Sequence, residues 1–296
     1  MKHQELKLKV PARGNIPAAE LYIEHYPVQN GNPNAPTMIC LPGGPGGGMG
    51  IYKNYQVDKF TKFANVILMD PRGCGNNPPC IKAEYHIDVY IDDIDAIRKH
   101  FKLEKWIVLG TSYGSMTAHG YAIRHGEHLQ GLVIVNGAPN SEYVELARQH
   151  VKEDGSKAQQ DMFERLLAGT LPPDGALSEY FEVMKSMYSF KERHHPNSLP
   201  SAKRVFNAEA AIAGLGPNGF IRDFNWLPEL HKVTCPTLII VGKQDWVNDP
   251  RLLEKTHKAI ANSDMHVIDN CGHYIWHDQP EQYFEVIENW LRTISA

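Results

Sequence analysis

A serine flanked by glycines is the first feature of this sequence that could carry chemistry. The segment Gly110-Thr-Ser-Tyr-Gly114 fits the pattern Gly-x-Ser-x-Gly, follows an apolar run at 106–109 and precedes a helix-like stretch at 115–125. In a sharp strand-to-helix turn, such glycines relieve crowding while the serine hydroxyl projects from the carboxyl end of the strand. The pattern also occurs by chance, and a plain strand-to-helix turn would look the same. Ser112 is therefore a candidate nucleophile that needs partners.

A base and an acid follow Ser112 in the chain. A serine hydroxyl is a poor nucleophile unless a base accepts its proton and an acid orients that base. Asp245 comes shortly after the apolar run 237–241, and His273 comes shortly after the run 265–268. The order Ser, Asp, His is the one used with a Gly-x-Ser-x-Gly turn. We expect the three side chains to meet at one edge of a parallel sheet.

Each of these two partners has a rival nearby. Asp249 could be the acid, but it directly precedes Pro250 and so suits a helix N-cap. His277 could be the base, but it lies near the start of the last expected helix. His273 and His277 have the spacing of a zinc-binding helix, yet Tyr274 follows His273 where His-Glu-x-x-His needs Glu. The sequence therefore predicts no metal and no cofactor.

A glycine-rich loop, 41–48 (Leu-Pro-Gly-Gly-Pro-Gly-Gly-Gly), follows another apolar run. It lacks the Gly-Lys-Ser/Thr ending of a phosphate loop, and its glycines do not fit Gly-x-Gly-x-x-Gly. Such a loop brings backbone close to a ligand. We expect the N–H groups of Gly44 and Tyr113 to bind the oxyanion of a tetrahedral intermediate.

Short apolar runs separated by helix-like stretches indicate an α/β fold with a mostly parallel, doubly wound sheet. The region 140–226 breaks this alternation, because it contains helix-like stretches and no buried-strand run. We therefore expect a core domain formed by residues 1–139 and 227–296, with a helical cap inserted at 140–226. The helices expected in this insertion cover 141–152, 159–168, 177–189 and 202–214.

Composition narrows the class of protein. The chain has 296 residues, is 42% hydrophobic and 22% charged, and carries a formal charge of −4. This charge provides no attraction for nucleic acid or an anionic membrane, and no apolar run approaches the length of a membrane span. The five cysteines are scattered and form no Cys-x-x-Cys pair, which indicates a reduced, cytoplasmic enzyme. We expect a small-molecule or short-peptide substrate; the sequence does not indicate an oligomeric state.

Five motifs, in order, give the chain a family resemblance: the glycine loop, Asp-Pro-Arg-Gly-Cys-Gly, Gly-Thr-Ser-Tyr-Gly, Gly-Lys-Gln-Asp and Cys-Gly-His. Over about residues 36–290 the chain resembles the α/β-hydrolase superfamily and, within it, the proline iminopeptidase family. The resemblance implies a triad of Ser112, Asp245 and His273, oxyanion donors at Gly44 and Tyr113, and a helical cap between the sixth and seventh strands. It also implies release of N-terminal residues, often proline, from peptides.

The sequence departs from that family where a substrate ammonium group would bind. Pro42 replaces the histidine before the paired glycines, a change expected to alter loop packing more than chemistry. Gly219 and Trp246 stand where relatives carry glutamates. A buried ammonium without an acidic partner is costly, and Glu209 is the candidate replacement. Without it, we expect uncharged esters or amides, with Trp246 as an apolar wall.

These features together predict a serine hydrolase that acts through an acyl-enzyme. The first expectation is a proline iminopeptidase-like aminopeptidase, and the alternative is a carboxylesterase or lactonase. Two other classes use the same fold. A ligand receptor would have a degraded triad, which this chain does not have, and a cofactor-free lyase or haloperoxidase would be distinguished by its products.

Overall fold

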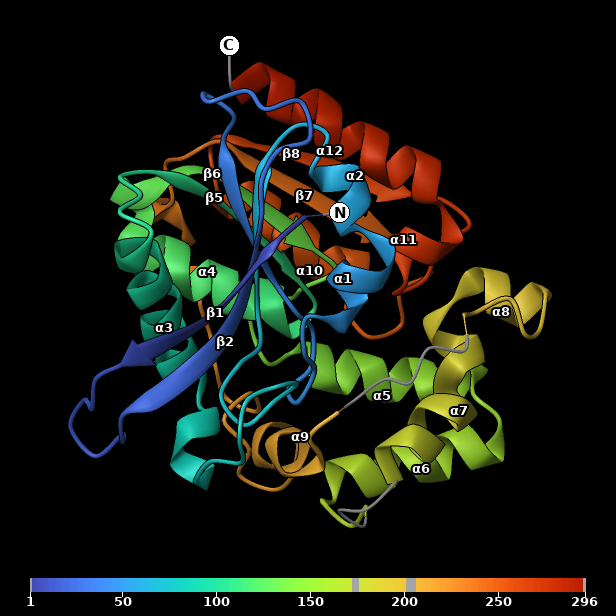
Figure 1. Cartoon of the computed structure of the whole chain (residues 1–296). Coiled ribbons are helices and arrows are strands. Elements are labelled where there is room, and N and C mark those ends of the chain that lie inside the picture. Colours follow the sequence, from blue (N-terminus) through green and yellow to red (C-terminus); the bar gives the residue numbers. More distant parts are fainter. Residues whose placement is uncertain (1, 172–175, 201–205, 295–296) are drawn as a thin grey trace.

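The computed structural model describes residues 2–171, 176–200 and 206–294. Within these residues, eight strands form one sheet in the order β1-β2-β4-β3-β5-β6-β7-β8 (Figure 1). Each apolar run expected to be a strand belongs to this sheet. The strands are β1 (Gln4–Val10), β2 (Ala19–Tyr26), β3 (Thr37–Leu41), β4 (Asn65–Met69), β5 (Trp106–Thr111), β6 (Leu129–Val135), β7 (Thr237–Gly242) and β8 (Ser263–Ile268).

Strand direction places the chemistry-bearing residues at one edge. The strands from β3 to β8 run parallel to one another, whereas β1 and β2 pair antiparallel. Ser112 directly follows β5, Asp245 follows β7 and His273 follows β8. All three therefore lie beyond the carboxyl ends of parallel strands, where open α/β sheets place their sites.

The central strands of the sheet are buried on both faces. In β3, Ile39 and Leu41 join one core cluster, whereas Met38 and Cys40 join the other, as the two-residue period of a strand requires. The first face packs against α3 (Ile87–His100), α4 (Tyr113–His125) and α10 (Pro250–Ala259). The second face packs against α1 (Gly50–Tyr55), α2 (Val57–Phe60) and α12 (Pro280–Ile294).

One strand differs from its expected environment. The run 265–268 was expected to be buried, but β8 is half-exposed along most of its length and Val267 is 47% exposed. The reason is its position: β8 pairs only with β7 and forms the end of the sheet. Its apolar sequence alone could not distinguish an end strand from a central one.

Between β6 and β7, the described residues form five α-helices. They are α5 (Tyr143–Asp154), α6 (Lys157–Leu167), α7 (Ala176–Tyr188), α8 (Phe190–His194) and α9 (Ala208–Leu215). They gather at the lower right of Figure 1, beside the carboxyl edge of the sheet. The helix expected over 202–214 begins at 208, because the Asn207 side chain caps it by accepting from the N–H groups of Glu209 and Ala210. Residues 202–205 of that prediction lie outside the described residues, and α8 was not expected.

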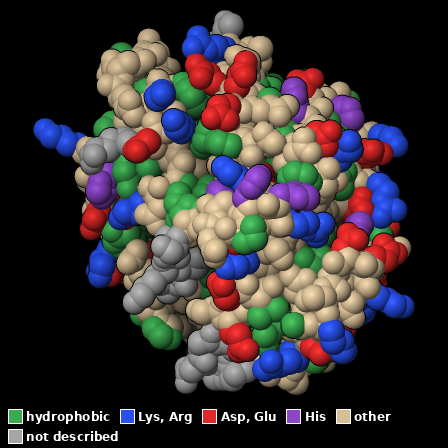
Figure 2. Space-filling view, turned by 90° about the vertical axis from the view of Figure 1, so that its right-hand side faces the viewer, with side chains coloured by type: hydrophobic (Ala, Val, Ile, Leu, Met, Phe, Trp, Pro, Cys, Tyr) green, Lys and Arg blue, Asp and Glu red, His purple; other side chains and the backbone are tan. Residues whose placement is uncertain are grey.

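The face of the molecule shown in Figure 2 carries charge of both signs. On the face in Figure 2, acidic and basic side chains are interspersed with apolar ones. Over the described part of the chain, none of the helices combines the length and apolar character needed to cross a membrane.

Candidate active site

Ser112 occupies a strained turn between β5 and α4. Its backbone has φ 57° and ψ −120°, a region that residues with a side chain rarely adopt. The turn is held by hydrogen bonds on both sides: the Ser112 N–H donates to the Val135 carbonyl at 2.9 Å, and the Ser115 N–H donates to the Ser112 carbonyl at 2.9 Å. The strain is thus maintained by the sheet and by the first turn of α4.

The two glycines of the turn are required by close packing. A Cβ on Gly110 would overlap the backbone of Gly114, and a Cβ on Gly114 would overlap the carbonyl oxygen of Leu41. The glycines of the motif are therefore required sterically, because the first turn of α4 packs directly against the ends of β3 and β5. The same closeness brings the glycine loop beside the serine.

His273 and Asp245 form a hydrogen-bonded pair. The Nδ1 atom of His273 lies 2.8 Å from Oδ2 of Asp245, and both side chains are buried. The other Asp245 oxygen accepts from the N–H groups of Val247 and Asn248 at 2.8 and 3.1 Å. The carboxylate is therefore fixed by its own loop. With Nδ1 engaged, the Nε2 atom is the nitrogen of His273 left for a substrate or a serine.

Two buried asparagines join the loops that carry this pair. Asn136 follows β6, has φ 48°, donates to the His273 carbonyl at 2.8 Å and accepts from the Gly242 N–H at 3.0 Å. Asn248 donates to the Asn136 carbonyl at 2.8 Å. Sequence reasoning missed both. An Asn-Gly pair directly after an apolar run was the available signal at Asn136, because asparagine tolerates a positive φ.

The expected oxyanion donors lie beside Ser112. A Cβ on Gly43 would stand 3.8 Å from the Ser112 hydroxyl oxygen, so the glycine loop runs directly past it. Gly44 lines the same cavity with φ 155°, and the space around it admits no side chain. Tyr113 is the first residue of α4, where helical N–H groups have no acceptor within the helix.

Ser112 and His273 open into a cavity of about 340 Å³. Its wall beside the glycine loop contains Lys53, Asn54 and Asn76. Its other wall is apolar and aromatic and comes mainly from the helices between β6 and β7 and from the loop after β7. That wall includes Val144, Phe163, Leu166, Leu177, Tyr180, Phe181, Tyr188, Leu215 and Trp246.

Trp246 lies where the sequence placed it, as a buried wall of this cavity. The edges of its ring meet Phe163 and Tyr188 at centroid distances of 5.3 and 5.2 Å. Such edge-on contacts fix the plane of the indole. The position that directly follows Asp245 is therefore rigid and apolar.

Glu209 does not line the cavity. Its side chain is exposed at the first turn of α9, and its carboxylate accepts from the Tyr85 hydroxyl at 3.4 Å. Glu209 thus stands exposed beside the Asn207 cap of α9, and its expected contact with a substrate ammonium stays a prediction. At Gly219 a Cβ would overlap the carbonyl of Gly214, so this turn holds no acidic side chain either.

Among the described lining residues, Asp70 is the one that carries a carboxylate. Its two oxygens accept from the N–H of Met49 at 2.7 Å and from the backbone and side-chain amides of Asn76 at 2.8 and 2.9 Å. Burial raises the pKa of Asp70 even though these hydrogen bonds lower it. Its acceptor capacity is used to hold the turn that follows β4.

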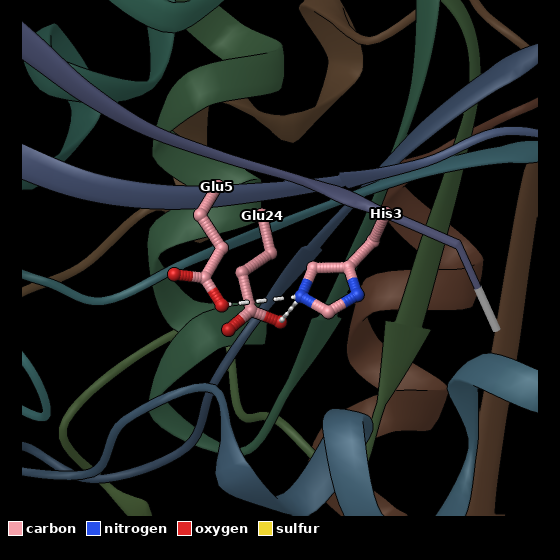
Figure 3. A group of neighbouring side chains, drawn as sticks. All are labelled: His3, Glu5 and Glu24. Atoms are coloured by element: carbon pink, nitrogen blue, oxygen red, sulfur yellow. Dashed lines mark hydrogen bonds and ion pairs between the residues drawn. The ribbon is translucent and has the colours of Figure 1, made fainter.

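A cluster elsewhere has the donor types of a metal site. The ligand atoms of His3, which directly precedes β1, of Glu5 on β1 and of Glu24 on β2 lie within 4.8 Å of one another (Figure 3). Glu24, however, is already neutralised by Lys53 at 2.6 Å and accepts from the hydroxyls of two tyrosines, Tyr22 and Tyr26. Burial raises the pKa of Glu24, but these hydrogen bonds outweigh it and lower that pKa. Lys53 thus already supplies a positive charge to the buried carboxylate of this cluster.

Known proteins are similar to this chain in sequence and in fold. Residues 36–280 match the family described as alpha/beta hydrolase fold. The chain is 30% identical over 295 residues to the proline iminopeptidase of Saccharolobus solfataricus, covering 93% of this chain and 90% of that protein. It is 27% identical to the proline iminopeptidase of Thermoplasma volcanium, with coverage of 90% and 92%. The crystal structure of a Mycobacterium smegmatis proline iminopeptidase shares the fold, with a TM-score of 0.76, 22% identity and coverage of 98% and 99%.

Proposed function

The chain belongs to the α/β-hydrolase fold family, and from that premise we propose that it is a serine hydrolase with Ser112, His273 and Asp245 as its triad. One observation carries the proposal: Ser112 and His273 face a single cavity, and Asp245 holds the imidazole at 2.8 Å. The strained turn at Ser112 supports it, because such strain collects at reactive sites.

The reaction follows from these positions. The Ser112 hydroxyl oxygen attacks the substrate carbonyl carbon while Nε2 of His273 takes the hydroxyl proton. Asp245 keeps Nδ1 protonated and stabilises the imidazolium without taking the proton. When the tetrahedral intermediate collapses, the leaving nitrogen or oxygen takes the proton from His273. Water then attacks the acyl-enzyme, gives its proton to His273, and the Ser112 oxygen leaves and is reprotonated.

Gly44 and Tyr113 are the proposed oxyanion donors. Gly44 lines the same cavity as Ser112 in the glycine loop, and Tyr113 directly follows Ser112 at the start of α4. Charge develops on the carbonyl oxygen only as the bond to serine forms, so fixed donors stabilise the transition state more than the ground state. Each donor of this kind contributes roughly 3 kcal/mol.

For the substrate, we propose first the release of N-terminal residues such as proline from short peptides. The similarity to proline iminopeptidases over more than nine-tenths of the chain supports this assignment. The apolar wall supplied by α5, α6, α7 and α9 suits a proline ring, and these helices act in the proposal as a cap over the cavity.

A second substrate class is favoured because the described cavity wall offers no available acidic group. An aminopeptidase must balance a substrate ammonium, and desolvating that charge without an acid is costly. Among the described residues on the cavity wall, Asp70 alone is acidic, and its oxygens are engaged. A carboxylesterase or lactonase acting on small uncharged substrates needs no such partner.

Covalent labelling tests the proposed nucleophile. A fluorophosphonate should add once to the wild-type protein, with the mass increase located on Ser112, and Ser112→Ala should not react. His273→Ala should keep the serine but label far more slowly, because the base is missing. An unlabelled wild type, or equal labelling of Ser112→Ala, would refute the serine hydrolase assignment.

Three substrates distinguish the two classes. Prolyl-naphthylamide, its N-acylated form and a p-nitrophenyl ester of similar size are compared by kcat/KM, with Ser112→Ala as the background. An aminopeptidase loses most of its activity when the amine is blocked. Equal or faster turnover of the blocked amide, together with rapid ester hydrolysis, would instead establish the esterase class.

A further inference from the structure

The loop that carries His273 is tied to the junction between α7 and α8, which comprises residues 188–191. The carbonyl of Tyr188, the last residue of α7, accepts from the N–H of His273 at 2.8 Å and from that of Tyr274 at 3.2 Å. Gly272 lies so close that a Cβ there would stand 2.8 Å from the same carbonyl oxygen. The backbone of the proposed base thus rests directly on the helical insertion.

Asp278, in α11 (Ile275–Asp278), holds the two segments together. Its side chain is buried, and each of its oxygens accepts two hydrogen bonds. Oδ1 accepts from the Ser189 hydroxyl at 2.5 Å and the Lys191 N–H at 3.1 Å. Oδ2 accepts from the Phe190 N–H at 2.9 Å and the Gly272 N–H at 2.8 Å. Three of these donors belong to the junction and one to the loop of the histidine.

No reaction step proposed above uses this carboxylate, yet its hydrogen bonds are complete. A carboxylate that accepts four donors in a buried place is a strong crosslink, because charge-assisted hydrogen bonds are about twice as strong as neutral ones. It joins residues almost ninety positions apart in the sequence. The crosslink lies five residues from His273 and contacts the residue just before it.

We propose that Asp278 is a positioning residue, which fixes the His273 backbone against the α7–α8 junction. The inference rests on the proposed function, because it assigns a purpose to the position of that imidazole. The same contacts connect the cavity wall formed by α7 to the loop that carries His273. Tyr180, Phe181 and Tyr188 line the cavity from α7, so a ligand that packs against this helix acts on the segment that holds His273.

The test compares Asp278→Ala with a matched control, Glu192→Ala. Glu192 is also a buried carboxylate of this region, but it accepts from Asn197, Ser198 and Leu199 and has no hydrogen bond to residues 272–274. Both variants should lower the melting temperature. Only Asp278→Ala should lower kcat, by roughly ten- to a hundredfold as expected for a misplaced base, with KM for the best substrate changing less.

Two further measurements keep the test decisive. Active enzyme is counted by fluorophosphonate titration, so that unfolded protein does not count as lost kcat. If Asp278→Ala does not fold, Asp278→Asn is measured in its place, since its amide nitrogen cannot accept. Amide hydrogen exchange at His273 and Tyr274 reads the link without catalysis, and exchange should accelerate in the Asp278 variants and not in Glu192→Ala.

The outcomes separate this inference from the assignment beneath it. A wild type that neither reacts with the probe nor hydrolyses any substrate refutes the proposed function, and the exchange measurement still decides whether Asp278 fixes the loop. An active wild type with equal kcat in the Asp278 and Glu192 variants, or with unchanged exchange at residues 273 and 274, overturns the positioning role.

Discussion

Two aspartates of one short loop each form a hydrogen bond with a histidine from another segment. The two pairs have the same distance but differ in burial and in the other hydrogen bonds of the carboxylate. Asp245 meets His273 and Asp249 meets His150, each at 2.8 Å. His273 is 6% exposed in its side chain, whereas His150, on α5, is 28% exposed. Asp249 was the alternative acid in the sequence, so the contrast bears directly on the proposed triad.

The difference lies in what else each carboxylate holds. One oxygen of Asp245 accepts from two N–H groups of its own loop, and the other contacts the imidazole of His273. Asp249 caps α10 and also takes a two-pronged contact from Arg251 at 2.8 and 2.6 Å. Burial raises the pKa of Asp249, but hydrogen bonds from Arg251 and His150 outweigh it and hold that pKa well below its usual range. One pair orients an imidazole at a cavity; the other fastens α5 to the start of α10.

The sharpest way to break this comparison is to neutralise each aspartate in turn. Asp245→Asn should lower kcat by about 10⁴-fold, because an amide in that place favours the wrong imidazole tautomer. Asp249→Asn should leave kcat within a few-fold of wild type, although it weakens a helix cap. Steady-state kinetics with the best substrate measures both. A larger loss for Asp249→Asn would exchange the roles assigned to the two pairs.

A smaller effect is expected from the residue between the two aspartates. Asn248 is fully buried, accepts from the Ala138 N–H at 3.0 Å and donates to the Asn136 carbonyl. Asn248→Ala leaves both backbone groups unpaired, at about 1–3 kcal/mol for each. Denaturant unfolding should show a loss of that size, with a fall in kcat because the Asp245 loop loosens. Unchanged stability would mean that the asparagine network does not support the pair.

The smallest effect concerns pH and the exposed pair. The hydrogen bond to Asp249 raises the pKa of His150, although burial and Arg251 oppose the rise and Asp154 adds to it. A raised folded-state pKa gives stability that is fully present below the unfolded value of about 6.5 and is lost as pH rises through the folded value. His150→Gln should therefore be less stable than wild type at pH 5.5 and nearly equal at pH 9.

The size of that pH-dependent difference should stay under about 1 kcal/mol, because solvent screens a partly exposed pair. Asp249 stays ionised throughout this range, so the change reports on the histidine alone. Denaturant unfolding of both proteins across the range provides the measurement. A stability difference between the two proteins that grows as pH rises would have the wrong sign and would contradict the assigned His150–Asp249 ion pair.

Much of the frame was predictable from local pattern. Buried apolar runs marked the strands, and Gly-x-Ser-x-Gly with the later Asp and His marked the residues that the parallel strands bring to one edge. These signals work because parallel strands are buried on both faces and their carboxyl ends coincide. Several of the longer helices were also predictable, from apolar spacing and from caps such as Asp249-Pro250.

The parts that sequence could not provide depend on side-chain direction and long-range contacts. Glu209 seemed available to a substrate, but the phase of α9 turns it to solvent. Asp278 has no sequence pattern that indicates its partners, because these are groups of the α7–α8 junction and the N–H of Gly272. The apolar run at β8 could not reveal that it would become the last strand of the sheet.

The backbone at Ser112 has one more consequence, for how evolution can alter this protein. A residue without a side chain would occupy φ 57° and ψ −120° with less strain, so Ser112→Gly should melt at a higher temperature than Ser112→Ala. Selection for stability alone therefore favours loss of the hydroxyl, and only selection for activity retains it. The proposed nucleophile thus stands at a position where selection for stability alone favours glycine.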